Sequence, residues 1–497
     1  MGIWRTLMKN PDAMQAFGFS IVAILLVVLQ TKKSKKVAPL PPVVGKMMET
    51  LKQLNTAETP WFLLKLAMTL PAGQRVYRLA LPPTAPHTVV VADPAAARQL
   101  LMDKGTDKAA LFDEFKSLLS GMHSVFTLAS KDPRQNPARK GTAAAFSSRR
   151  VENSLKTEAF ASVLDDLFAI FDKGEAFDPA ELLTMAMMDI LGRVSFGGVD
   201  FGTLKAVLNQ EEDSNDMGSI FLKELPIGLT EYSMSRMFNP WRKYYYRLTK
   251  SGNRAALARD RLWAVAKEVF EHRSKDETDG CAILDHLVQN KNYTTDDERI
   301  AEVLTYLIAG HDTTGYTLAF TVYEVAKAGP EFSQKLRDEI IKGDHKQIDS
   351  LFERTCKEAL RLWPVAAMGS FREVTAPNGI HVETNSLDLF LPKGATLVFP
   401  MLPILRAAPG VPDVDTFDPD RWLDPKQAQA LKDCFFPFSL GQRNCIGMAL
   451  AQAEHKYIFA AIVKHFDLDL IEDFKSDYFL TLKPKGGKLR AKRVSLS

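Results

Sequence analysis

The stretch FSLGQRNCIG, residues 438–447, decides how this sequence is interpreted. It places Cys445 in a turn between Gly441 and Gly447, ahead of an alanine-rich run that favours a helix. A disulfide cysteine needs a partner, and a structural cysteine usually lies on an apolar face. In a turn, backbone N–H groups are free to point at the sulfur, and with the N-terminus of the next helix they favour negative charge there. The stretch therefore suits a thiolate that holds a ligand.

The composition indicates a large globular protein. The chain has 497 residues, a net charge of +3 and 46% hydrophobic residues, which is ample for a large core, and no linker divides it. The nearly balanced charge gives no reason to expect nucleic-acid binding. The four cysteines are Cys281, Cys356, Cys434 and Cys445. None belongs to a C-x-x-C pair, so a zinc site or redox dithiol is not expected, and a reducing compartment fits best.

The N-terminus carries an apolar run without charges, AMQAFGFSIVAILLVVLQ, at residues 13–30. About 18 such residues approach the length that spans a bilayer. Four lysines follow at 32, 33, 35 and 36, which places the downstream chain in the cytosol. A cleavable signal peptide is the alternative, but it expects positive charge before the run. We expect a membrane anchor with a basic stop over residues 1–36, a proline-rich hinge over 37–45 and one folded domain over 46–497.

The folded domain is expected to be mostly helical from about 150 to 365, with strands and helices mixed on either side. A long helix begins after Thr295, which has capping-box spacing to Glu298, and it ends at Gly329-Pro330. Its centre, residues 309–315, reads AGHDTTG and combines weak helix formers. Two interpretations stay open for this centre: a tolerated weak spot, or a local opening where another group lies against the helix.

Two further motifs have ordinary interpretations when taken alone. In KEALRLWP, Glu358 and Arg361 share a helix face, as many surface ion pairs do. In FDPDRW, Arg421 lies in a proline-bounded loop.

Together and in this order, these motifs resemble the cytochrome P-450 family of haem-thiolate monooxygenases. The cysteine stretch extends to Ala451 as Phe438-x-x-Gly441-x-Arg443-x-Cys445-x-Gly447-x-x-x-Ala451. The apolar N-terminus, its lysines and the hinge resemble those of the microsomal, membrane-anchored members. The resemblance implies a mainly α fold with a smaller β part, formed by residues 46–497 and preceded by one transmembrane helix.

The resemblance also implies a cofactor, haem b, with Cys445 as the axial ligand of its iron. Ala309 replaces a glutamate that links haem covalently in some fatty-acid hydroxylases, so non-covalent haem is expected. The other implied cofactor contacts are Arg443, Arg372 and Arg139 at the propionates, with Phe438, Gly441, Gly447, Ala309 and Gly310 around the ring. Arg139 is less well supported, because Gln135 stands where the family often has tryptophan. Glu358, Arg361 and Arg421 would form a structural ion network behind the haem.

For catalysis, the resemblance assigns proton relay to Asp312 and Thr313. The alternative for Thr313 is a hydroxyl that bonds to a carbonyl one turn earlier in its helix. No dinucleotide motif, P-loop or iron–sulfur spacing occurs. Electrons are therefore expected from a separate NADPH-cytochrome P-450 reductase, sometimes helped by cytochrome b5. The expected substrate pocket is apolar and bounded by residues near Phe112–Phe126, Tyr306 and Ala309, 365–371 and Leu480–Leu482.

We therefore expect a single-pass protein of the endoplasmic reticulum membrane, with its catalytic domain facing the cytosol. It would insert one oxygen atom of O2 into a lipophilic molecule: a fatty acid, sterol, terpenoid or xenobiotic. Two alternatives stay open. One is an oxygen-independent haem-thiolate isomerase or dehydratase. The other is a non-enzymatic, membrane-tethered haem-binding protein.

Overall fold

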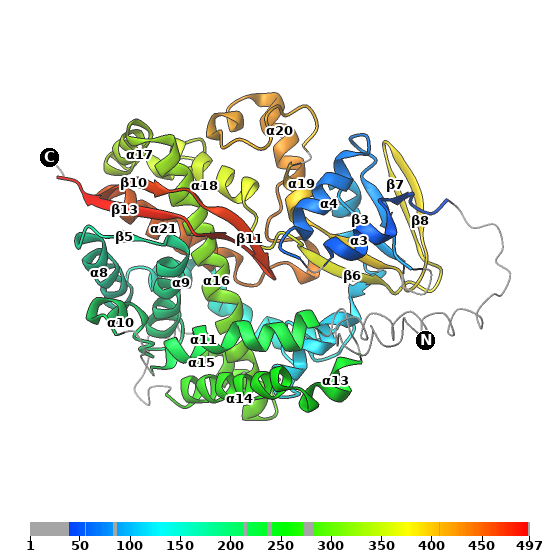
Figure 1. The fold of residues 1–497 in the computed structure, drawn as a ribbon, viewed down its shortest axis with the longest axis horizontal. Helices are drawn as coiled ribbons and strands as arrows, with labels where there is room; N and C mark the ends of the chain where they lie inside the picture. The colour runs from blue at the N-terminus through cyan, green and yellow to red at the C-terminus, as the bar shows by residue number, and fades with distance from the viewer. Residues whose placement is uncertain are drawn as a thin grey trace, which may run out of the picture.

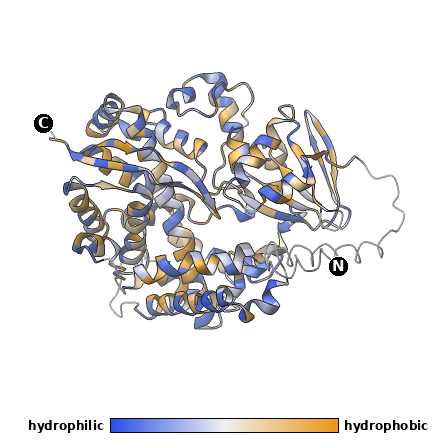
Figure 2. Cartoon of the chain, in the orientation of Figure 1, coloured by the Kyte–Doolittle hydropathy of each residue, from blue (hydrophilic) through white to orange (hydrophobic). Residues whose placement is uncertain are grey.

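The computed structural model describes residues 39–495, except 55, 83–86, 212–215, 236–240, 273–282 and 407. The expected anchor at residues 1–36 and Cys281 lie outside the described residues. Within the described part of the chain, none of the helices combines the length and apolarity needed to cross a membrane. Figure 2 shows hydrophilic and hydrophobic residues mixed along the helices, as expected when one face packs inward.

The fold is mainly helical, as predicted. The α-helices before the long central helix are α3 (Met47–Gln53), α4 (Thr59–Met68), α5 (Pro94–Met102), α6 (Gln135–Ala143), α7 (Ser148–Ser154), α8 (Glu158–Asp172), α9 (Pro179–Ile190), α10 (Thr203–Asn209), α11 (Met217–Leu229), α13 (Arg242–Tyr245), α14 (Lys250–Glu271) and α15 (Ile283–Gln289). The central helix and those after it are α16 (Asp296–Ala328), α17 (Pro330–Lys342), α18 (Leu351–Leu362), α19 (Met401–Arg406), α20 (Pro425–Cys434) and α21 (Met448–His465).

Shorter 3-10 and π segments lie between these helices: η1 (Ala110–Ser117), η2 (Ala144–Phe146), η3 (Leu191–Ser195), η4 (Thr230–Ser235), η5 (Tyr246–Leu248), η6 (Asp344–Lys346), η7 (Pro419–Trp422) and η8 (Gly441–Arg443).

Among the described residues, the β part consists of four sheets. A six-stranded sheet has the order β1 (Val43–Val44), β2 (Val76–Leu79), β3 (Thr88–Val91), β9 (Thr396–Phe399), β6 (Ser370–Val374) and β4 (Thr106–Lys108). A three-stranded sheet has the order β10 (Phe466–Glu472), β13 (Lys488–Arg493) and β5 (Ala176–Phe177). The two hairpins are β7 (Ile380–Thr384) with β8 (Leu387–Leu391), and β11 (Lys475–Phe479) with β12 (Thr481–Lys485).

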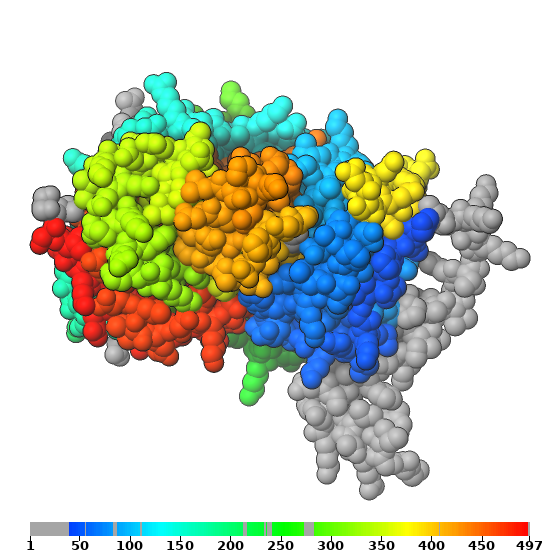
Figure 3. Space-filling view, turned by 90° about the horizontal axis from the view of Figure 1, so that it is seen from above, coloured from blue at the N-terminus to red at the C-terminus, as the bar shows by residue number. Residues whose placement is uncertain are grey.

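The N-terminal strands and helices lie with the β7–β8 hairpin at one end of the molecule, away from the helices around α17 (Figures 1 and 3). The N–H of Phe390 in β8 donates to the carbonyl of Pro39 at 3.1 Å, which ties the start of the described chain to this hairpin. A turn at Asn378-Gly379 precedes this hairpin, and Gly379 adopts φ +74°.

Helix α16 runs through the helical part of the molecule (Figure 1). The predicted capping box is present, with Thr295 accepting from the Glu298 N–H and the Glu298 side chain accepting from the Thr295 N–H. The helix continues without interruption through residues 309–315, so the structure shows a tolerated weak spot and not a local opening. A Cβ on Gly315 would stand 2.8 Å from Cα of Thr184, so this glycine is what lets α9 lie close against α16.

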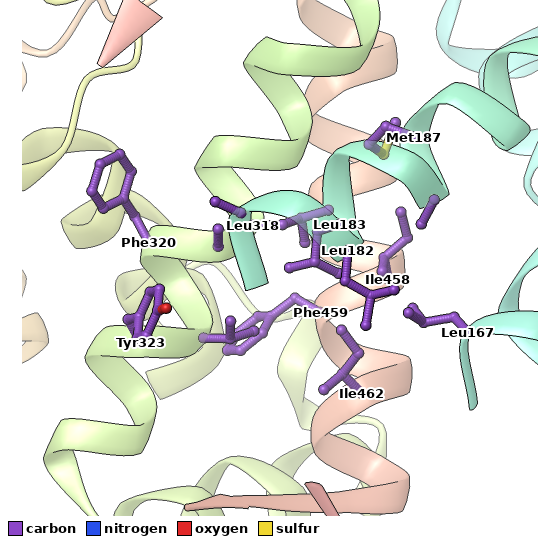
Figure 4. Packing of buried hydrophobic residues seen from close by; sticks show 14 of the residues in the cluster. Leu167, Leu182, Leu183, Met187, Leu318, Phe320, Tyr323, Ile458, Phe459 and Ile462 are labelled. Carbon is purple, nitrogen blue, oxygen red and sulfur yellow. The ribbon is translucent and has the colours of Figure 1, made fainter. Parts of the chain in front are cut away.

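The main core joins α8, α9, α16 and α21, as Figure 4 shows. Leu183 of α9, Leu318 of α16 and Phe459 of α21 are each at most 1% exposed. This packing holds the long helix at a fixed position relative to α21, the helix that directly follows the cysteine loop.

Candidate active site

The cysteine loop lies between η8 and the start of α21. The N–H of Cys445 donates to the carbonyl of Phe438 at 3.0 Å, which closes the loop. Gly441 has φ +76°, and a Cβ there would stand 2.5 Å from the carbonyl oxygen of Leu101. Its conformation and this close approach to α5 therefore both require glycine. The Cys445 side chain remains solvent-accessible at the end of this constrained loop.

The expected electrostatic support for a thiolate is present only in part. Although the Cys445 side chain is exposed, the protein packed around its sulfur raises the pKa of the thiol, while the Gly447 N–H and the charge of Arg139 lower it. Burial prevails, and the net pKa lies above its usual value. The predicted contribution of the loop is therefore present, since the Gly447 N–H favours the thiolate, but it acts against burial. A bound metal ion deprotonates a coordinating thiol.

Near this loop lies a group of cations with little compensating charge. Lys108 of β4 and Arg372 of β6 are register partners in the six-stranded sheet. Burial, then the charges of Arg443 and Arg372, lower the pKa of Lys108 well below its usual range. Burial likewise lowers the pKa of Arg372 and Arg443 to about 10 in each case. Asp107 is the anion that acts on all three cations.

The Asp107 carboxylate already accepts hydrogen bonds from the backbone. It accepts from the N–H groups of Lys108 at 2.7 Å, Ser130 at 2.7 Å and Lys131 at 3.3 Å. These bonds lower its pKa against the opposing effect of burial, so it is ionised, but it carries one charge among three cations. The site therefore favours an additional anionic group.

Unpaired donors also support the fit of an anionic cofactor. The Nε atom of Arg372 and the Nε2 atom of Gln135 are buried without a hydrogen-bond partner. Such donors are costly unless an acceptor satisfies them. At Gly447, a Cβ would lie in ordinary van der Waals contact with Cε1 of Phe146, at 3.9 Å, and with Sγ of Cys445, at 4.0 Å. These residues fit a porphyrin: Cys445 would hold its iron, and Arg372 with its neighbouring cations would hold its propionates.

Arg139 and Arg443 connect the cysteine loop to its surroundings. Nη2 of Arg139, on α6, donates to the carbonyl of Asn444 at 2.9 Å and to its Oδ1 at 2.8 Å. Arg443 donates to the carbonyls of Val125, at 3.3 Å, and Leu128. Arg139 thus contacts the residue before Cys445 directly, and helix α6 begins at Gln135 and includes Pro137 in its first turn.

The remaining predicted site residues lie at the centre of α16. Ala309 is exposed although it lies mid-helix, and Thr313 lies one turn further along the same face. The Thr313 hydroxyl donates to the carbonyl of Ala309 at 2.8 Å, which is the back-bonded alternative. Asp312 instead lies 3.0 Å from Nε2 of the buried His311. A Cβ on Gly310 would stand 3.0 Å from Cδ1 of Leu191, so Gly310 serves helix packing, and its contact with a cofactor stays a prediction.

The residues expected to line the substrate pocket differ in their exposure. The rings of Phe112 and Phe126 meet edge to face at 5.3 Å, and Phe112 also meets Phe371 at 6.1 Å. Phe126 is 39% exposed, and Nζ of Lys108 lies 3.6 Å from its ring centre. Tyr306 does not form a wall, because it is buried against Phe146 with ring centres 5.7 Å apart.

Leu482 is also core, with 0% exposure, and it donates its N–H to the carbonyl of Val365 at 2.8 Å. This bond brings β12 next to the segment 365–371. Ala366, on that segment, is exposed, which leaves it available as an apolar wall.

The predicted ion network is present and fully buried. Glu358 accepts from Arg361 in a bidentate pair and from Nε of Arg421 at 2.8 Å. Nε1 of Trp422 donates to the same carboxylate at 3.0 Å. All four side chains are at most 8% exposed. This arrangement excludes the surface ion pair that the motif alone permitted.

Two residues of the site were not predicted from sequence. Lys108 lies on the three-residue strand β4, and the strand that pairs with it is distant in the chain. The local sequence, TDK, therefore does not predict that Lys108 lies beside Arg372. His311 was quoted only as part of the motif. Its position directly before Asp312 was the one signal that could have drawn attention to it.

The comparisons with known proteins agree with this geometry. The family model Cytochrome P450 matches residues 39–490. Cyclooctat-9-en-7-ol 5-monooxygenase of Streptomyces melanosporofaciens is 26% identical over 82% of this chain and 85% of its own length. Cytochrome P450 4F12 of Homo sapiens is 31% identical over 40% of this chain and 39% of its own length.

A solved structure, the crystal structure of the cytochrome P450DA heme domain, has the same fold with a TM-score of 0.74, 20% identity, and coverage of 93% of this chain and 99% of that one. The chain belongs to the cytochrome P450 family. It is an oxidoreductase of the haem-thiolate monooxygenase class, and the cofactor of this class is haem b, held through a cysteine thiolate.

Proposed function

We propose that this chain inserts one oxygen atom of O2 into a lipophilic small molecule, with non-covalent haem held by Cys445. The observation that carries the proposal is the accessible Cys445 thiol beside buried cations that share one carboxylate. When bound, the haem supplies oxygen activation. The residues of the chain would hold it: Lys108, Arg372 and Arg443 balance its propionates, and the Glu358 network keeps the cysteine side of the fold rigid.

The substrate is proposed to lie against the exposed face of α16 at Ala309, between Ala366 and the ring of Phe126. These residues are apolar and accessible, which favours a lipophilic substrate. Sterols, terpenoids, fatty acids and xenobiotics share this property. A relative named for oxygenation of cyclooctat-9-en-7-ol supports an apolar substrate.

Proton supply is proposed to run through Asp312 and Thr313. The hydroxyl of Thr313 donates to Ala309, but its oxygen keeps lone pairs that can accept a proton. Asp312 is the adjacent carboxylate, with a pKa below its usual value despite burial, because of His311, Lys483 and Tyr316.

Electrons are proposed to come from a separate NADPH-cytochrome P-450 reductase, with cytochrome b5 as an optional second donor. The apolar run at residues 13–30 is proposed to anchor the chain in the endoplasmic reticulum membrane, with the folded domain in the cytosol. Deleting residues 1–36 tests the anchor: membrane association weakens while haem incorporation persists. Loss of haem in a well-expressed truncation contradicts a separable anchor.

Co-expression with a reductase, followed by metabolite profiling under 18O2, tests the reaction. The proposal expects a product that carries one 18O atom and requires both NADPH and O2. Product formed without O2 or NADPH instead supports the isomerase or dehydratase. Haem binding without turnover of any lipophilic substrate class supports a binding protein.

A further inference from the structure

His311 sits between two hydrogen-bond acceptors. Its Nδ1 lies 2.7 Å from the carbonyl oxygen of Leu307, one turn earlier in α16. Its Nε2 lies 3.0 Å from Oδ1 of Asp312. A carbonyl oxygen can only accept a hydrogen bond, and so can an ionised carboxylate. Both ring nitrogens must therefore carry a proton for both contacts to be hydrogen bonds, and a ring with two N–H groups is an imidazolium.

The ring has little freedom to move. His311 is 1% exposed, and the ring of Phe221 on α11 meets it edge-on with ring centres 5.5 Å apart. Burial opposes protonation of His311, but the charge and hydrogen bond of Asp312 and the bond to Leu307 outweigh it, so its pKa is raised. The other groups acting on Asp312 are Lys483 of β12 and Tyr316 of α16, and Tyr316 in turn senses Asp178 and Asp477.

A second buried histidine shows that burial alone does not have this effect. Nε2 of His455, on α21, lies 2.9 Å from the hydroxyl of Thr321, a group that can donate as well as accept. Burial lowers the pKa of His455 to about 3. The charge of the adjacent Lys456 also lowers the pKa of His455, whereas His311 has the Asp312 carboxylate at hydrogen-bond distance.

We propose that His311 is a positioning residue that holds Asp312 as a carboxylate on its Nε2 side and releases it only by giving it a proton. If the carboxylate rotated toward Thr313, a buried imidazolium would be left without its counter-ion, which is strongly unfavourable. Transfer of the Nε2 proton to Oδ1 breaks one N–H bond and forms one O–H bond. It leaves a neutral imidazole and a neutral carboxylic acid, which can rotate without separating charges, and solvent water then restores the proton to the pair.

This inference rests on the proposed relay through Asp312, and its first test does not depend on turnover. The protein is labelled with 15N in its histidine rings and examined by NMR as the diamagnetic ferrous carbon-monoxide complex. At pH 7, the signals that disappear in His311→Gln are expected to show two protonated nitrogens. The signals that disappear in His455→Gln are expected to show one. A neutral ring at position 311 would overturn the inference, whatever the enzyme's activity.

The second test measures product formed per NADPH oxidised. His311→Gln leaves Asp312 without its main counter-charge, so coupling should fall while hydrogen peroxide rises. The loss should lie between roughly tenfold and the roughly 10²–10⁴-fold that is typical of a removed proton-transfer group. Wild-type coupling should decline as pH rises through the pKa of His311, a dependence that the variant lacks. The matched control, His455→Gln, should stay within about twofold of wild type. Equal coupling and equal pH profiles in the two variants would overturn the inference.

If His311→Gln does not fold, Asp312→Asn replaces it in the NMR test. Removing the carboxylate should return the ring at position 311 to the neutral form, while an unchanged imidazolium would overturn the inference. Failure of the wild-type enzyme to form any product contradicts the proposed function instead, and it leaves the NMR result to decide the state of His311.

Discussion

Arg361 and Glu358 form a bidentate ion pair with both N···O distances at 2.8 Å, and both side chains are at most 1% exposed. Arg421 and Trp422 complete the coordination of the same carboxylate. Because the network is buried, removing one partner leaves an uncompensated charge. The pair therefore stabilises the region around the cysteine loop only as long as every member is present.

Glu358→Ala and Arg361→Ala are each predicted to destabilise the fold by about 3–5 kcal/mol and to lower haem content. Thermal unfolding and the haem-to-protein absorbance ratio measure the two effects. Arg354→Ala is the control on the same helix: Arg354 is also mostly buried, but its partner Asp420 is mostly exposed, so its removal leaves no buried charge unpaired. Equal effects of Arg354→Ala and Arg361→Ala would contradict this account.

The cation cluster leads to a prediction about haem retention. Lys108→Met and Arg372→Met should each speed transfer of haem to an acceptor such as apomyoglobin, because each removes a charge-assisted hydrogen bond to a propionate, worth about 1.5–3 kcal/mol. That range corresponds to roughly a 10- to 150-fold faster loss. Lys104→Met, an exposed residue just before β4, is the control and should behave as wild type. Unchanged haem loss in Lys108→Met would remove Lys108 from the cofactor site.

How far the sequence could predict this site depends on how local each feature is. The capping box at Thr295 and the turn at Gly441 are defined by neighbouring residues, and the sequence revealed both. The Glu358 network could be predicted because its motifs recur together in the family. Lys108 could not, since its position depends on the register between β4 and β6, which no local pattern sets.

The pairing of His311 with Asp312 could not be predicted for a similar reason. Adjacent residues on a helix usually point in different directions. Here Phe221, from a different helix, confines the His311 ring, and a carbonyl one turn back fixes its other nitrogen. For Cys445, the loop N–H groups that favour a thiolate could be expected from the sequence, whereas the burial that opposes it depends on the whole fold.

Glu302 gives a pH-dependent prediction. Its Oε1 accepts from the N–H of Val125 at 2.6 Å and from the hydroxyl of Tyr293 at 3.0 Å, and burial raises its pKa from 4.5 to about 7. The folded state therefore binds a proton that the unfolded state releases above 4.5. Stability should fall as pH rises from 4.5 to 7, by about 3 kcal/mol from this residue.

Glu302→Gln keeps a side-chain oxygen that accepts both hydrogen bonds, and it should remove this component of the pH dependence. Denaturant unfolding of the variant and wild type at pH 5, 6 and 7 measures it. Parallel pH profiles for the two proteins would show that the pKa of Glu302 is not raised.

Thr313→Ala is predicted to bind haem and substrate normally and to consume NADPH and O2, but to lose about 10²–10⁴-fold in product formation as hydrogen peroxide appears. Thr317→Ala is the matched control, since its hydroxyl makes the same back-bond, to the carbonyl of Thr313 at 2.8 Å. Coupling like that of wild type in Thr313→Ala would show that this hydroxyl only bonds its own helix, and the oxygen-independent alternative would gain support.

The central claim, that Cys445 ligates the haem iron, is tested most directly by the Soret band of the reduced carbon-monoxide complex. Cys445→Ser is predicted to lose the thiolate-type band, because a hydroxyl does not replace the thiolate ligand. Cys434→Ser should keep it, since Cys434 is buried and its Sγ donates to the carbonyl of Ala430. A thiolate-type band that persists in Cys445→Ser would contradict the account.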